Sequence, residues 1–174
     1  MTDTTTTPKD TTASAPVNWK VNLHQLKLKN VSFGMKLPAD SMKMAAYIGE
    51  VTIDDAKADL KNQFYGLKQF LLSGASASYA TGEAQPSEGF DASHMAVRNI
   101  RIGLDSLLYE GRNMNAVIRE ITMEERSGLS ITSLTGRLFS NDSIIRIPEL
   151  KLQTPHSEID LSAQTYWELV NIPT

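Results

Sequence analysis

Two pairs of adjacent carboxylates are the residues of this chain best suited by type to acid–base chemistry. Asp54-Asp55 and Glu124-Glu125 stand 70 residues apart, and each pair follows a stretch of spaced apolar residues. Paired carboxylates can act as general acid and base when their environments separate their pKa values. Here both pairs fall where a strand is expected to end, and acidic residues are common in turns. Turn chemistry is therefore the favoured interpretation of both pairs.

Other residue types that carry catalysis or bind metals are sparse. The three histidines, His24, His94 and His156, fall in different segments, none in a metal-ligand spacing with a carboxylate, so we expect them at the surface. The absence of cysteine excludes thiol catalysis, disulfides and cysteine zinc sites. Residues 73–78 alternate like a strand and lack a nucleophile partner, and no phosphate-loop or dinucleotide motif is present. We predict no catalytic residue, metal site, cofactor or enzymatic activity.

Bulk composition limits the partners of this chain. Its 174 residues, 41% of them apolar, suffice for one domain or a few stacked repeats. A net charge of −3 without any basic run argues against nucleic-acid binding. No stretch approaches the roughly 20 apolar residues of a membrane-spanning helix. Residues 1–16, rich in Thr, Ser and Pro, are expected to form a disordered lead-in rather than a signal peptide.

The elements that would position any site carry one repeated phrase, apolar-x-x-apolar-x-apolar. It is written six times: Leu28-Val31-Phe33, Ile48-Val51-Ile53, Leu67-Phe70-Leu72, Val97-Ile100-Ile102, Ile118-Ile121-Met123 and Ile147-Leu150-Leu152. The last three phrases follow the first three at offsets of 69, 70 and 80 residues. This order predicts a duplicated β unit, with about ten additional residues in the second copy.

Each phrase contains a break in strand alternation. Residues of one face recur every second position in a strand, so a spacing of three would move later side chains to the opposite face. In the first phrase the break falls at Lys29-Asn30, and in the fourth at Arg98-Asn99. Asn tolerates the left-handed backbone conformation, which favours a bulge or sharp bend that keeps one face apolar. The alternative is a solvated polar pair between two shorter strands.

Strand periodicity begins near Val17, and two segments also fit helical spacing. These are 42–46, and the series Leu60, Phe64, Leu67 and Leu71. The counterpart of the second segment contains Pro148 and alternates like a strand, which favours strands in both copies. Turns are expected at 124–128 and 140–143, and a strand end at Thr154-Pro155. The expected organisation is a lead-in (1–16), a first β repeat (17–80), a linker (81–92), a second β repeat (93–165) and a tail (166–174).

The fold class predicted is all-β, with mostly antiparallel strands that are apolar on one face. Burying a Val, Leu, Ile or Phe side chain contributes roughly 1.5–3 kcal/mol, so a face with a dozen such residues must be covered. The cover is either a second sheet, a neighbouring unit or lipid. With aromatic residues at only 7%, the aliphatic face suits acyl chains as well as a plain core. From the pattern alone, an open groove and a closed sandwich are equally favoured.

The C-terminal half of this pattern resembles the TamB family, within the wider AsmA-like group. It is most similar to the TamB-like translocation and assembly modules of the Bacteroidetes. The resemblance covers residues 17–165 and rests on apolar spacing together with the elements E-x-S-G-L and L-x-T-P-x-S. The matching residues are Val97-Arg98-Asn99-Ile100, Ile118, Ile121, Met123, Glu125-Arg126-Ser127-Gly128-Leu129, Ile131, Leu134, Ile145, Ile147, Leu150, Leu152, Thr154-Pro155, Ser157 and Ile159.

The resemblance implies an elongated, curved antiparallel sheet that forms a hydrophobic, β-taco-like groove lined by the residues of the six phrases. It implies a periplasmic location, within a protein anchored in the inner membrane that carries phospholipids toward the outer membrane. Its partners would be phospholipid acyl chains, neighbouring repeats of the same protein and an outer-membrane assembly barrel. Because the chain is shorter than the family's proteins, a fragment of the groove is expected. The alternative is a structural β-sandwich or β-solenoid with a plain core and no lipid.

Overall fold

The structure, a computed structural model, describes residues 18–38, 41–82 and 85–170. These residues fold almost entirely into β-strands, with a short 3₁₀ helix, η2, at Trp167–Leu169. The predicted all-β class is therefore confirmed. The strands are β1 (Lys20–Leu37), β2 (Met42–Asp59), β3 (Phe64–Leu67), β4 (Gln69–Ala80), β5 (His94–Glu110), β6 (Asn113–Glu125), β7 (Ser130–Ser140), β8 (Ile144–Gln153) and β9 (Glu158–Tyr166).

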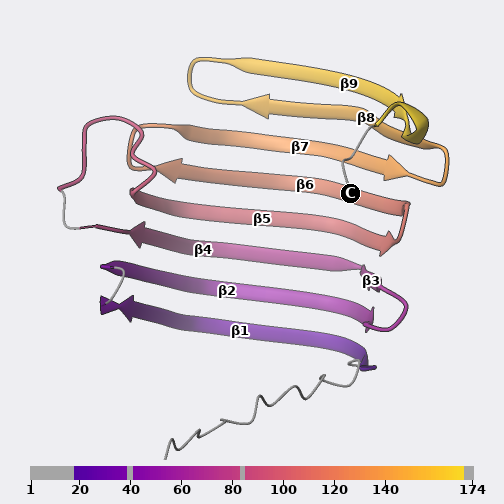
Figure 1. Cartoon of the computed structure of the whole chain (residues 1–174), viewed down its shortest axis with the longest axis horizontal. Coiled ribbons are helices and arrows are strands. Elements are labelled where there is room, and N and C mark those ends of the chain that lie inside the picture. The colour runs from indigo at the N-terminus through magenta and orange to yellow at the C-terminus, as the bar shows by residue number, and fades with distance from the viewer. Residues whose placement is uncertain (1–17, 39–40, 83–84, 171–174) are drawn as a thin grey trace, which may run out of the picture.

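All nine described strands belong to one antiparallel sheet. They follow one another in chain order from β1 at one edge to β9 at the other, as Figure 1 shows. β3 and β4 occupy one place in this order, because both lie between β2 and β5 and are separated only by Lys68. Such a meander needs only short connections, since successive places in the sheet are filled in chain order.

The sheet has no second layer within the described part of the chain. The contacts between strands are made mainly by neighbours in the sheet, from β1 with β2 to β8 with β9. A sandwich would instead join strands that are distant in the sheet order. The described strands therefore cannot bury their apolar side chains against one another across a core.

The two segments with ambiguous periodicity are strands or turns. Residues 42–46 begin β2, and residues 60–71 comprise the turn after β2, then β3 and the start of β4. Turns between β6 and β7 and between β7 and β8 lie where the sequence predicts them, and β8 ends directly before Thr154. These local predictions are confirmed. They could be made because turns and strands depend largely on the residue types within the segment itself.

The predicted linker, 81–92, joins two strands that pair with each other. β4 and β5 lie side by side from Phe70 opposite Leu104 to Ala80 opposite His94. The strands of the two predicted repeats consequently form one continuous sheet. The phrases are distributed along it, with one in each of β1, β2, the β3–β4 line, β5, β6 and β8.

Left-handed residues accompany the breaks in alternation at Asn30 and Asn99, each with a φ of 54°. The register between β1 and β2 is the same before and after Asn30, so both strands bend together and no residue is inserted. Beyond Asn99 the register between β5 and β6 shifts, so this break includes an irregularity of pairing. The prediction that Asn adopts the left-handed conformation is confirmed, as a bend in β1 and as an irregularity in β5.

Candidate functional site

A row of apolar side chains crosses the entire sheet. Each member lies directly opposite the next in the strand register, and opposed residues of antiparallel strands project from the same face. From β1 to β9 the row consists of Leu28, Val51, Leu72, Ile102, Ile121, Leu134, Leu152 and Ile159. We call the face that carries this row the apolar face.

A second row runs beside the first. It consists of Leu26, Ile53, Phe70, Leu104, Ile118, Gly136, Leu150 and Leu161. Its one glycine is required, because a Cβ at Gly136 would lie 2.8 Å from Cδ1 of Leu150 and 2.9 Å from the carbonyl oxygen of Glu149. The Leu150 side chain thus covers the position where Gly136 has none, and the row remains apolar.

The two rows contain ten of the eighteen residues predicted to line a groove: Leu28, Val51, Ile53, Phe70, Leu72, Ile102, Ile118, Ile121, Leu150 and Leu152. The other eight also lie opposite residues of neighbouring strands. Val31 is paired with Ile48, Phe33 with Ala46, Val97 with Ala77, Ile100 with Ala75, Met123 with Ile131, Leu67 with Leu107 and Ile147 with Ala163. The structure therefore brings most of the predicted residues into adjacent rows.

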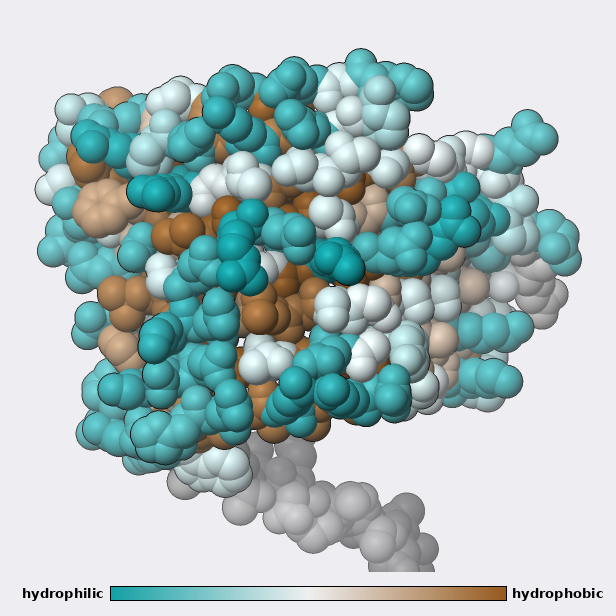
Figure 2. Space-filling model, turned by 180° about the vertical axis from the view of Figure 1, so that it is seen from behind, coloured by the Kyte–Doolittle hydropathy of each residue, from teal (hydrophilic) through white to brown (hydrophobic). Residues whose placement is uncertain are grey.

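The apolar face is largely uncovered by the described part of the chain. Only two apolar residues of this part are buried, Val51 at 7% exposure and Ala75 at 5%. Exposure rises toward both edges of the sheet, with Leu28 in β1 at 38% and Ile159 in β9 at 53%. In Figure 2 hydrophobic side chains gather in the middle of the visible face, with hydrophilic ones on either side.

A cavity of about 870 Å³ crosses the sheet beyond the line of Asn30 and Asn99. It follows a third row that runs from Phe33 through Ala46, Ala77 and Val97 to Glu125. Of the eighteen predicted residues, only Phe33 and Val97 line this cavity, while Leu67 lines a smaller one of about 560 Å³. The remaining predicted residues lie on the sheet outside both cavities.

Sequence reasoning missed the small residues that make this cavity. Ala46 and Ala77 lie between the larger Phe33 and Val97, so the surface is lower along this part of the row, and Ala45 and Ala96 also line the cavity. These alanines are hard to recognise in the sequence as part of a site, because a short side chain is neither strongly apolar nor strongly polar. That Ala46 lies opposite Ala77, between Phe33 and Val97, could be recognised only once the register of the strands was known.

Glu125 ends the third row with a buried carboxylate, at 7% exposure. The carboxylate accepts hydrogen bonds from the backbone N–H of Ser127 at 2.6 Å and of Ala96 at 3.4 Å. Hydrogen bonds from Ser127 hold the pKa of Glu125 below its usual range. This carboxylate closes the turn from β6 to β7, so the predicted turn role holds for Glu125, which stays ionised beside the cavity. Glu124 instead lies within β6, where its carboxylate accepts hydrogen bonds from Arg98 and Asn99.

The prediction of a turn at Asp54-Asp55 is wrong. Both residues lie within β2, and Asp55 has a left-handed φ of 48°. Asp54 accepts a hydrogen bond from the side-chain amide of Gln25, and Asp55 lies 3.5 Å from Nδ1 of His24. The sequence suggested a turn because Asp is frequent there, but a single left-handed Asp also fits a bend inside a strand.

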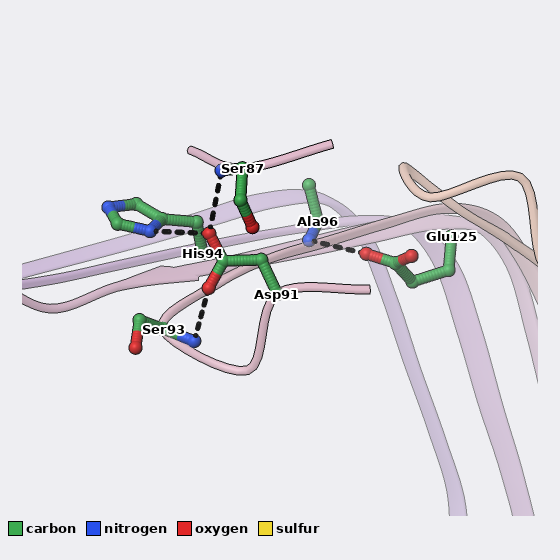
Figure 3. A network of polar contacts seen from close by, with 6 residues as sticks. All are labelled: Ser87, Asp91, Ser93, His94, Ala96 and Glu125. Carbon is green, nitrogen blue, oxygen red and sulfur yellow. Dashed lines mark hydrogen bonds and ion pairs between the residues drawn. The ribbon is translucent and has the colours of Figure 1, made fainter. Parts of the chain in front are cut away.

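His94 is mostly buried, contrary to the expectation that the histidines are at the surface. Its side chain is 11% exposed and Nδ1 lies 3.0 Å from Oδ2 of Asp91, in the loop before β5. Backbone N–H groups of Ser87 and Ser93 also donate to Asp91, as Figure 3 shows. The hydrogen bond from Ser87, followed by those from Ser93 and His94, lowers the pKa of Asp91 to about 2.

The Asp91 network holds a loop together and does not form a metal centre. Across the described ranges, no group of three His, Asp or Glu side chains is arranged to hold a metal ion. No helix in the described residues is long and apolar enough to span a membrane. Comparisons with protein-family models, with curated proteins and with solved structures found no match.

Proposed function

We propose that this chain is a lipid-binding module whose apolar face shields phospholipid acyl chains. The observation that carries the proposal is the apolar row from Leu28 to Ile159, which crosses every strand line of a sheet with only two buried apolar residues. Some other surface must cover this face, because burying a large apolar side chain is favourable by roughly 1.5–3 kcal/mol relative to leaving it in water.

Acyl chains fit this face better than a ligand of fixed shape. The two complete rows are almost wholly aliphatic, and an acyl chain gains about 0.8 kcal/mol for each buried CH₂ group. We propose that the sheet curves into an elongated groove around such chains, with the row from Phe33 to Glu125 near one end. No chemical step is part of this function, and the matched phrases lead us to propose that the sheet arose by duplication.

The resemblance to TamB-like proteins extends the proposal to transport. On this basis we place the module in the periplasm, as a segment of an inner-membrane-anchored protein that carries phospholipid toward the outer membrane. Neighbouring repeats would continue the groove, and an outer-membrane assembly barrel would be its partner. Fractionation of cells that express the native gene tests the location, since a cytosolic protein would contradict this part of the proposal.

Lipid extraction of the purified chain, followed by mass spectrometry, is the direct test. We expect co-purified phospholipid and uptake of a fluorescent fatty acid. Leu28→Asp, on the apolar face but 38% exposed, should lower the affinity for the fatty acid about tenfold while the fold is kept. Thr52→Asp on the opposite face is the matched control and should have no effect.

The alternative, a structural face covered by protein, predicts different results. Ile121 lies in the middle of the long row, so Ile121→Asp should prevent folding if the face is a plain core. If the face binds lipid, this variant should fold, as circular dichroism would report, and lose lipid. A folded wild-type chain that neither contains lipid nor takes up the fatty acid would overturn the proposal.

A further inference from the structure

Within the described part of the chain, both edges of the sheet have backbone groups available for another strand. β1 pairs only with β2, and β9 pairs only with β8, among the described strands. The segment after β9 turns away from its free edge, because Trp167 donates hydrogen bonds to the carbonyl oxygens of Asn141 and Ser143 in the β7–β8 loop. Free edges of this kind can accept a strand from another molecule.

The two edge strands carry opposite charges. β1 contains Lys20, Lys27, Lys29 and Lys36 and no acidic residue, whereas β9 contains Glu158 and Asp160 and no basic one. Lys27 and Lys29 share a single carboxylate, that of Glu50, at 2.6 and 3.3 Å. This pair of lysines therefore retains positive charge that a further carboxylate could neutralise.

The strand directions and the register fit the same arrangement. Neighbouring strands of the sheet are antiparallel throughout, and as a result β1 and β9 run in opposite directions. The β1 strand of a second copy could therefore lie antiparallel beside β9 and continue the meander. Leu28 and Ile159 are the two ends of the long apolar row. If the row continues across the junction, Lys27 of the second copy lies opposite Asp160, and its Lys29 lies opposite Glu158.

We propose that copies of this chain associate head to tail, through β9 of one copy and β1 of the next. Each of the two opposed charge pairs stabilises the junction. Pairing of β1 with a second β1 would oppose lysine to lysine, and pairing of two β9 strands would oppose carboxylates. The junction leaves a free β1 and a free β9 at the ends, so the assembly is open and extends the apolar face. This proposal rests on the two edge strands and does not depend on lipid binding.

Sedimentation of the full-length chain at increasing protein concentration tests association. We expect the average mass to rise with concentration and to fall as salt is added. The double variant Glu158→Lys/Asp160→Lys should weaken association about tenfold, because two attractive pairs become repulsive. A chain that stays monomeric at all concentrations, or one whose association is unaffected by this variant, overturns the proposal; the second result would indicate contact through the apolar faces.

Cysteine cross-linking tests the register, since the native chain contains no cysteine. A mixture of the single variants Leu28→Cys and Ile159→Cys should form a disulfide between copies. The off-register mixture of Phe33→Cys and Ile159→Cys is the control, because Phe33 is also exposed on β1 but lies five residues away. Equal cross-linking in both mixtures, or cross-linking of Leu28→Cys with itself, would contradict the head-to-tail register.

Discussion

Asn30 and Asn99 have the same left-handed backbone, with a φ of 54° in each, although they lie on β1 and β5. Between them, in β2 and β4, lie Gly49 and Gly74, whose backbones are in close contact. Gly74 is also left-handed, with a φ of 63°. The four residues mark a line where the strands bend, and the large cavity lies on one side of it.

The first prediction concerns the left-handed conformation of Asn99. A β-branched side chain is strained in this conformation by roughly 1–2 kcal/mol, whereas glycine adopts it freely. Asn99→Val should therefore lower the free energy of unfolding by about that amount relative to Asn99→Gly, measured by urea denaturation. Both variants lose the hydrogen bond from Asn99 to Glu124, so their difference isolates the backbone. Equal stabilities would show that the bend is not strained.

The second prediction concerns the close approach of β2 and β4. A Cβ at Gly49 would lie 2.9 Å from the carbonyl oxygen of Ser73 and 3.0 Å from that of Gly74. Because these backbone atoms cannot move aside cheaply, Gly49→Ala should destabilise the protein by about 1–3 kcal/mol. Gly34→Ala is the control, since a Cβ there has open space. It should be neutral or stabilising by up to about 1 kcal/mol in the same denaturation measurement.

The third prediction concerns pH and Asp91. Its pKa of about 2 lies below the usual value of 3.8, so ionised Asp91 stabilises the fold above pH 3.8. This stabilisation is lost as the pH falls from about 3.8 to about 2. Asp91→Asn should lower the thermal midpoint at neutral pH, and the difference from wild type should vanish near pH 2. Asp142→Asn, in another loop, is the control, and a difference that is constant with pH would contradict the prediction.

The fourth prediction concerns the anchor of the C-terminal strand. The indole N–H of Trp167 donates to the carbonyl oxygen of Asn141 at 2.7 Å, and the guanidinium of Arg112 lies 5.5 Å from the ring centre. Trp167→Phe removes the donor but keeps a ring, and should cost about 0.5–1.5 kcal/mol. Hydrogen exchange should accelerate in β8 and β9. Trp19→Phe, at a residue that is 70% exposed, should leave these amides unchanged.

Much of the fold could be predicted, because each strand or bend depends on the residue types and spacing within its own short segment. The apolar phrases identified strands in β1, β2, the β3–β4 line, β5, β6 and β8, and the asparagines identified the bend in β1 and the irregularity in β5. The burial of His94 could not be predicted, because it depends on how the loop before β5 folds onto Asp91. The bend at Asp55 was mistaken for a turn because the same residue type suits both.

By itself the sequence determined the all-β class, the alternation of the strands and the apolar character of one face. These follow from residue type and spacing along a single strand. Only the tertiary structure decided that the strands form one sheet and that Leu28 and Ile159 end the same row. It also decided that alanines from β2, β4 and β5 adjoin to form a cavity. The physical reason is that pairing between strands depends on the free energy of contacts between distant segments, which no single segment specifies.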